Sequence, residues 1–316
     1  NIKEVIPEFL LLLKGVIDCP DLPLNVSRSA LQNDGFVKKI SDYITKKVAD
    51  KLSGMCKTQK DKYEKYWDDI APFIKFGCLK DEKFCEKMTD YILFKNLDGK
   101  YMTLPECLEV NKKDKTIYYV TDEKQQSQYI NMFKAAKMDA VMLTDRIDQP
   151  FISQLEAKNE GIHFARIDAD LTDAFKAKTS KKTQEELNAQ AEKVEKLVQK
   201  ALKNDKIKVK IEKLKNKKVS SVLTVSEESR RMQDMMKMYG GGMDMSMFGA
   251  EGETLVLNAN HPLVTYITEH EDDANTEMIC EQLYDLAKLQ NAPLSPEAMT
   301  KFVARSNDIM LLLAKQ

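Results

Sequence analysis

The chain is poor in the residues that metal and catalytic sites depend on. Its 316 residues include three histidines, His163, His261 and His270. None stands at a metal-like spacing from a cysteine or from another histidine, so we expect no metal site, and a histidine-based catalytic triad is equally unsupported. The six cysteines are scattered and form no C-x-x-C pair. This usage favours reduced thiols in a cytosol over a disulfide framework.

Other absences narrow the class of protein further. No apolar run approaches the roughly 18–20 residues that a membrane helix needs. Residues 9–13 are apolar, but no basic leader or small-residue cleavage site accompanies them. No glycine-rich phosphate loop stands between a strand and a helix, and the net charge of −1 gives no general attraction to nucleic acid. We therefore expect a cytoplasmic protein that binds neither nucleic acid nor membranes.

What the chain does have is length and apolar content. With 316 residues, of which 43% are hydrophobic and 31% charged, it is long enough for two or three compact units with real cores. To about residue 96 the pattern is helical, with apolar spacings of three and four that predict helices over 34–52 and 62–75. The single tryptophan, Trp67, falls in the second helix. We interpret it as a core or groove anchor rather than as a platform for a ligand.

The middle of the chain changes period. Short apolar runs over 116–121, 140–144 and 162–167 predict three strands, and the helical stretches 123–136 and 149–158 lie between them. Alternation of strands and helices is typical of a small parallel sheet with covering helices. We therefore predict a small α/β unit over 101–176.

The last part mixes both patterns. We expect a helix over 179–202, strands over 207–212, 219–225 and 254–257, and closing helices over 276–290 and 295–313. The closing helices carry more apolar residues than such a short pair can bury by itself, which predicts a four-helix bundle with a second copy. The candidate interface residues are Leu283, Leu286, Phe302, Val303, Ile309, Met310 and Leu313.

One segment is rich in methionine. It begins with a capping signal at Ser226, and seven methionines follow within the sixteen residues 232–247, interrupted by three glycines at 240–242. Methionine specifies packing poorly, but it adapts to unlike apolar partners. We favour a surface that binds apolar segments over a disordered loop without a role. Its candidate contacts are Met232, Met235, Met236, Met238 and Tyr239.

Residues 22–32 begin with an extended, proline-bounded approach that stops at a helix start, where Ser27 is a good N-cap. Arg28 and Gln32 then stand four residues apart, on one face of the helix. Such a pair beside a helix N-terminus could receive a phosphate. On spacing alone, a capped helix whose arginine meets a solvent-side carboxylate is the more common outcome.

The motifs over 18–32, 117–121, 143–148 and 257–264 together resemble the ninety-kilodalton heat-shock chaperone family, bacterial HtpG type. The resemblance runs from Pro7 to Leu313. It implies an α+β multidomain fold: residues 1–100 would end the large middle subdomain and add a helical connector, 101–176 would be the small α/β middle subdomain, and 177–316 the C-terminal dimerisation domain. Because the chain opens in mid-motif without a methionine, we expect a fragment of a longer protein.

The resemblance also implies a function. In this family an ATP-driven dimeric clamp binds and remodels non-native client proteins, and Arg28, assisted by Gln32, would contact the γ-phosphate held by a separate N-terminal domain. ATP and magnesium would be bound by the full-length ATPase, and no cofactor by this fragment. The Met-rich residues and Trp67 would contact clients, while His261 would have a structural, capping role. The alternative is a dimeric scaffold or holdase that binds apolar segments without nucleotide.

Overall fold

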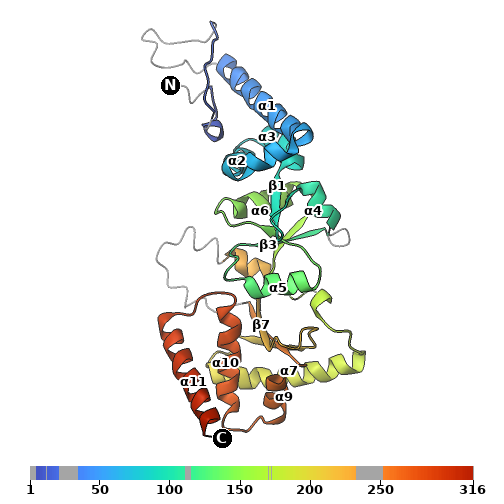
Figure 1. Cartoon of the computed structure of the whole chain (residues 1–316), viewed down its shortest axis with the longest axis vertical. Helices are drawn as coiled ribbons and strands as arrows, with labels where there is room; N and C mark the ends of the chain where they lie inside the picture. The colour runs from blue at the N-terminus through green and yellow to red at the C-terminus, as the bar shows by residue number, and fades with distance from the viewer. Residues whose placement is uncertain are drawn as a thin grey trace. The chain divides into compact units, whose positions relative to one another are not determined.

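The computed structural model describes residues 5–11, 13–20, 35–110, 115–169, 171, 173–232 and 252–315. The described chain mixes helices with two sheets, as the predicted α+β class requires (Figure 1). Its contacts divide it into two compact units, Asn1–Thr121 with Asp139–Phe164, and Asp122–Met138 with Ala165–Gln316. The domain boundaries at residues 100 and 176 stay a prediction.

The first unit begins with helices. The long helix α1 (Gly35–Thr58) packs against α2 (Lys60–Lys80) and α3 (Glu82–Met88), with short 3-10 turns η2 (Glu8–Leu10) and η3 (Thr89–Tyr91) beside them. Both predicted helices are confirmed, and each is longer than its apolar pattern indicated. The Asp81 side chain starts α3 because its carboxylate accepts a hydrogen bond from the Phe84 backbone N–H at 2.9 Å.

A five-stranded sheet belongs mainly to the first unit. Its strands are β1 (Leu93–Asn96), β2 (Tyr101–Thr103), β3 (Thr116–Val120), β4 (Val141–Met142) and β5 (His163–Arg166), in the order β2-β1-β4-β3-β5. Strands β3 and β4 are parallel, as predicted, but β1 is antiparallel to both of its neighbours. The sheet is therefore mixed. Helices α4 (Leu104–Val110) and α6 (Asp148–Lys158) belong to the same unit.

The helical prediction to residue 96 was wrong for β1. A tight turn decides this segment: the Asn96 side-chain oxygen accepts hydrogen bonds from the backbone N–H groups of Asp98 at 3.0 Å and Lys100 at 2.9 Å. Gly99 takes a φ of +78°, which a residue with a side chain adopts reluctantly. This Asx-type turn reverses the chain and pairs β1 with β2.

The second unit is built around a three-stranded sheet. Strand β8 (Glu253–Asn258) is central, parallel to β6 (Lys208–Glu212) and antiparallel to β7 (Ser221–Val225). All three predicted strands are confirmed. The helical elements of this unit are α5 (Ser127–Ala135), the 3-10 turn η4 (Asp173–Phe175), α7 (Lys181–Leu202), α9 (Pro262–Glu269), α10 (Thr276–Leu289) and α11 (Pro296–Ala314).

Capping explains where several of these helices begin. The His261 Nδ1 accepts a hydrogen bond from the Leu263 backbone N–H at 3.3 Å, so the structural role expected for His261 is confirmed. Ser295 caps α11 in the same way, with Pro296 as the first helical residue. All six cysteines are free thiols. No helix among the described residues has the length and apolar character needed to cross a membrane.

Candidate functional site

The two residues expected at a γ-phosphate, Arg28 and Gln32, lie outside the described residues. The description resumes at Gly35, the first residue of α1. Their role therefore stays a prediction. Within the described ranges, no group of three or more histidine, cysteine, aspartate or glutamate side chains is arranged to hold a metal ion.

The structure describes the two points at which the Met-rich segment joins the sheet of the second unit, its base. Residues 227–232 are helical, and Met232 exposes 58% of its surface; Met235, Met236, Met238 and Tyr239 lie outside the described residues. Strands β7 and β8 meet at the pair Val225 and Glu253, so the two ends of the segment start from the same place.

Three residues, Ser226, Ser229 and Gly252, pack together at this base. The Ser226 hydroxyl accepts a hydrogen bond from the Ser229 backbone N–H at 3.3 Å and lies 2.9 Å from the Ser229 hydroxyl. Gly252 approaches so closely that an added Cβ would meet the Ser229 Oγ at 2.3 Å, and its φ is +84°. A side chain at position 252 would therefore push the start of this helix away from the sheet.

A buried cluster of charged and polar residues lies beside this base. We name it the Asp168 cluster, and its members are Arg166, Asp168, Arg230 and Asn291. The Arg166 guanidinium donates to both carboxylate oxygens of Asp168, from Nε at 2.6 Å and from Nη2 at 2.5 Å. The Arg230 Nη2 lies 3.2 Å from Asp168 Oδ2 and 2.5 Å from Asn291 Oδ1. Asp168 has no exposed surface, so it holds two arginines inside the protein.

The electrostatics of the Asp168 cluster favour the charged carboxylate. Burial by itself would raise the pKa of Asp168, but the hydrogen bonds and charge of Arg166, together with the charge of Arg230, outweigh it. The pKa of Asp168 is therefore lowered, and the carboxylate stays ionised.

The Asp168 cluster joins several elements of the second unit. The Asn291 side-chain amide donates to the Leu223 carbonyl of β7 at 3.0 Å, and the Tyr129 hydroxyl of α5 donates to the same carbonyl at 2.5 Å. The Glu227 carboxylate accepts the Arg166 backbone N–H at 3.0 Å. The start of the Met-rich segment is thus connected to α5, to β7 and to the turn after α10. Sequence reasoning missed this cluster because its members are far apart in the chain.

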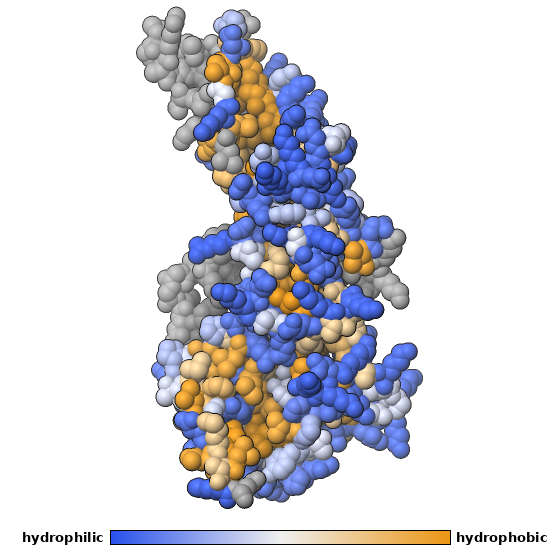
Figure 2. Space-filling view, in the orientation of Figure 1, coloured by the Kyte–Doolittle hydropathy of each residue, from blue (hydrophilic) through white to orange (hydrophobic). Residues whose placement is uncertain are grey.

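The closing helices present an apolar face. Helix α11 has no buried residue, and its exposed apolar side chains include Val303 at 50%, Met310 at 58% and Leu313 at 66% exposure. Phe302 and Ile309 are partly exposed, and Leu286 on α10 is 37% exposed. Figure 2 shows apolar side chains gathered over α10 and α11.

Polar contacts fix α11 on α10. Arg305 donates to Glu281 Oε2 at 2.7 Å and to Gln282 Oε1 at 2.8 Å, and it forms an ion pair with Asp285. Leu283, which was expected at the interface between copies, is only 1% exposed and packs in the core of its own unit. The exposed members of the predicted set therefore lie mainly on α11.

Trp67 lies in the core of the first unit. It is 3% exposed, and its ring centroid lies 5.4 Å from that of Tyr63, which is fully buried. This placement agrees with the interpretation of Trp67 as a core anchor. Its indole is not on a surface that a client could reach in this structure.

Comparison with known proteins identifies the family. A family model described as Hsp90 protein matches residues 1–315, nearly the whole chain. The chain belongs to the Hsp90 family. The resemblance inferred from the residues is thereby confirmed, and the strand-to-helix corner at His261 is one of the Hsp90-like motifs that the structure describes.

Bacterial Hsp90 relatives are similar over most of the chain. The protein named Chaperone protein HtpG from Porphyromonas gingivalis is 34% identical over 302 residues, covering 92% of this chain and 44% of the relative. The HtpG of Bacteroides fragilis is 35% identical over 315 residues, with 92% and 45% covered. The HtpG of Treponema denticola is 27% identical over 324 residues, with 98% and 49% covered. The chain thus spans about half the length of the curated relatives it matches.

Proposed function

We propose that this chain is the middle and C-terminal part of a cytoplasmic molecular chaperone of the HtpG type, an ATP-driven dimeric clamp for non-native client proteins. Membership of the Hsp90 family and the names of the relatives support this proposal. In it, residues 1–100 end the large middle subdomain, 101–176 form the small α/β subdomain, and 177–316 form the dimerisation domain. ATP and magnesium bind to a separate part of the whole protein.

The observation that carries the proposal is the apolar face of α11. Nineteen residues form this helix and none of them is buried, although Met310, Leu311, Leu312 and Leu313 are 58%, 55%, 44% and 66% exposed. A face of this kind is stable in water when another apolar surface covers it. A second copy supplies the same face, and a two-fold axis would pair the α10–α11 helices into a four-helix bundle.

Sedimentation equilibrium of the chain tests the dimer. We expect a two-chain mass for the wild type, and a one-chain mass for the double variant Met310→Glu, Leu313→Glu, because each new carboxylate would have to be buried at the interface. The matched control is Ala189→Glu, Gln190→Glu, which adds two carboxylates to the exposed side of α7 and should leave the dimer intact. A monomeric wild type, or equal dissociation of the control, would contradict the proposal.

In the proposed clamp, Arg28 acts on the nucleotide. It would stabilise the charge that develops on the transferred phosphoryl group, as an arginine finger does, with Gln32 as its helper. In the full-length protein we expect Arg28→Ala to reduce ATP turnover by about 10³-fold while nucleotide binding stays nearly unchanged. Steady-state hydrolysis and equilibrium binding of a fluorescent nucleotide measure the two effects separately. Unchanged turnover would remove Arg28 from the mechanism.

A second candidate function is a nucleotide-independent dimeric holdase. The exposed Met232 at the base of the Met-rich segment and the apolar α11 face favour it, because neither requires nucleotide. The two candidates differ in one measurement on the full-length protein. If Arg28→Ala abolishes ATP turnover but leaves suppression of client aggregation unchanged with ATP present, the holdase is the better description. If suppression falls together with turnover, the ATP-driven clamp is supported.

A further inference from the structure

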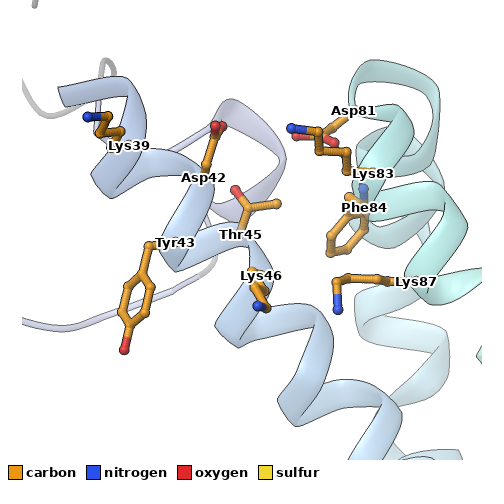
Figure 3. A pocket seen from close by; sticks show the side chains of 9 residues that line it. All are labelled: Lys39, Asp42, Tyr43, Thr45, Lys46, Asp81, Lys83, Phe84 and Lys87. Atoms are coloured by element: carbon orange, nitrogen blue, oxygen red, sulfur yellow. Dashed lines mark hydrogen bonds between the residues drawn. The ribbon is translucent and has the colours of Figure 1, made fainter. Parts of the chain in front are cut away.

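The first unit contains a cavity of about 310 Å³ between α1 and α3 (Figure 3). Its deepest lining residues are Thr45 and Phe84, which are 5% and 1% exposed. Tyr43 adds a second aromatic ring to the lining. The cavity is distinct from the Met-rich segment and the α11 face, and the proposed function makes no use of it.

Positive charge dominates the rim of this cavity. Lys39 and Lys46 come from α1, and Lys83 and Lys87 come from α3. Two carboxylates, Asp42 and Asp81, also line it, so four ammonium groups face two carboxylates. Figure 3 shows the Lys83 side chain extending from α3 toward α1, with the Lys46 and Lys87 ammonium groups further along the same gap.

Some of these charged side chains already have partners, and the others are the groups that a ligand could contact. The Asp81 carboxylate caps α3 through the Phe84 N–H at 2.9 Å. The Lys87 ammonium donates to Asp50 Oδ1 at 3.0 Å. Within the described ranges, Lys46 and Lys83 form no ion pair. Asp42 is therefore the one lining carboxylate without a described hydrogen-bonding role, whereas three lining lysines, Lys39, Lys46 and Lys83, have no ion pair among the described residues.

The field of these lysines extends to a neighbouring carboxylate. The hydrogen bond from Lys87 lowers the pKa of Asp50, and the charges of Lys87, Lys46 and Lys47 add to the effect. The lower rim of the cavity is thus a place where a negative charge is favoured. An anion that entered the cavity would meet the same field.

The cavity combines lysine side chains with an aromatic residue, and this combination indicates which ligand it could bind. A hydrated inorganic anion would use the lysines but gain nothing from Phe84, and a neutral aromatic molecule would use Phe84 but not the lysines. A volume of about 310 Å³ lies at the lower end of small-molecule sites. We propose that this cavity binds a small aromatic acid, with its ring over Phe84 and Thr45 and its acidic group attracted by the lysines at either end of that surface, Lys46 and Lys83.

Naphthalene-1-sulfonate is a suitable probe, and the whole chain is the sample. Calorimetric titration at low salt should show binding that weakens as salt is added, since exposed charges are screened. In NMR spectra the signals of Thr45 and Phe84 should shift, which separates this site from dye bound to the α11 face. The neutral analogue 2-naphthol and inorganic sulfate should each bind at least about tenfold more weakly, because each lacks one half of the ligand.

Matched variants test whether the lysines of the cavity bind the sulfonate. Lys46→Glu with Lys83→Glu should weaken sulfonate binding at least about tenfold, because two attractive charges become repulsive. Lys51→Glu with Lys65→Glu makes the same change in net charge at exposed positions of α1 and α2 that do not line the cavity, and should retain binding. Thr45→Leu should also reduce binding by filling the cavity, with circular dichroism confirming the fold.

Three results would overturn the proposal. The first is equal loss of binding in the Lys51, Lys65 control, which would mean that only net charge matters. The second is equally tight binding of 2-naphthol, which would mean that the lysines take no part. The third is shifts confined to α11 signals, which would place the probe elsewhere. None of these results bears on the dimer, so the proposed function would stand or fall separately.

Discussion

Asp148 in the first unit and Asp168 in the second are both buried aspartates, yet their surroundings move their pKa values in opposite directions. Among the described residues, Asp148 has one cationic partner, the buried ammonium of Lys75, and it accepts a hydrogen bond from the Asp145 backbone N–H at 3.0 Å. Burial prevails there, and the pKa of Asp148 is raised. Asp168 has the Arg166 fork and Arg230, and its pKa is lowered.

The difference teaches what a buried carboxylate needs to stay charged. Removing a carboxylate from water costs several kcal/mol of free energy, and the attraction of one lysine ammonium offsets only part of that cost. A guanidinium that binds both oxygens, together with a second guanidinium nearby, offsets more of the desolvation cost, because both oxygens are then hydrogen-bonded in a fixed geometry. The Lys75–Asp148 pair is therefore a weakly favourable ion pair, whereas the Asp168 cluster depends on its charge.

The largest effect should come from removing the charge of Asp168. Asp168→Asn would leave Arg166 and Arg230 buried without a counter-charge, and we expect it to destabilise the second unit by about 3–5 kcal/mol. Hydrogen exchange of peptides from β7, β8 and α10 in the whole chain measures this. The sole tryptophan, Trp67, lies in the first unit, so its fluorescence should report a nearly unchanged transition. Unaltered exchange in β7 would show that the cluster is not needed for stability.

A smaller effect should follow from Lys75→Met. The substitution leaves a buried carboxylate without its lysine, but Asp148 can take up a proton because its pKa is already raised. We expect a loss of about 2 kcal/mol at pH 7, decreasing toward pH 5. Urea unfolding followed by Trp67 fluorescence checks it, with the exposed Lys65→Met on the same helix as the control. A loss as large as that of Asp168→Asn would contradict the difference between the two sites.

The smallest effect is a difference in pH dependence. The folded-state pKa of Asp168 lies below the ordinary aspartate value of 3.8, so its stabilising contribution is present above that pH and is lost as the pH falls through the lowered value. The folded-state pKa of Asp148 lies above 3.8, so its contribution runs the other way, and stability falls as the pH rises from 3.8 through the raised value.

Unfolding between pH 3 and pH 7 should therefore separate the two units. Acidification should weaken the second unit, as followed by hydrogen exchange, more than the first unit, as followed by Trp67. The control is Asp148→Asn, which should flatten the Asp148 contribution in the first unit and leave the second unit unaffected. Parallel pH profiles for the two units in the wild type would show that other titrating groups dominate.

The sequence predicted elements wherever a periodic apolar pattern is long. Helix α7 has buried residues at Leu187, Val194 and Val198, the spacing that its apolar stripe predicts, and strict alternation predicted β6. The sequence pattern did not predict β1, a strand of four residues whose pairing depends on the Asn96 turn and on β4. Short strands carry too little pattern to outweigh a helical neighbourhood.

The candidate sites show the same difference between local patterns and contacts of distant residues. The apolar closing helices could be predicted because their residues are regularly spaced, and the Met-rich segment, whose residues are contiguous, stays a prediction. The Asp168 cluster and the Lys46–Lys83 cavity could not, since residues 166, 230 and 291, or 46 and 83, have no relation in the sequence. Leu283 and Leu286 show the limit within one helix: both are apolar, but the first is 1% exposed and the second 37%.

By itself, the sequence determined the family, the principal helices and strands, and the apolar character of α11. These properties depend on local motifs and on the period of hydrophobic residues, and both can be read along the chain. Only the tertiary structure decided that Trp67 is buried, that Leu283 faces its own core and that Asp168 holds two arginines. Burial and charge pairing depend on which distant segments meet, and the energy of a buried charge depends on those partners.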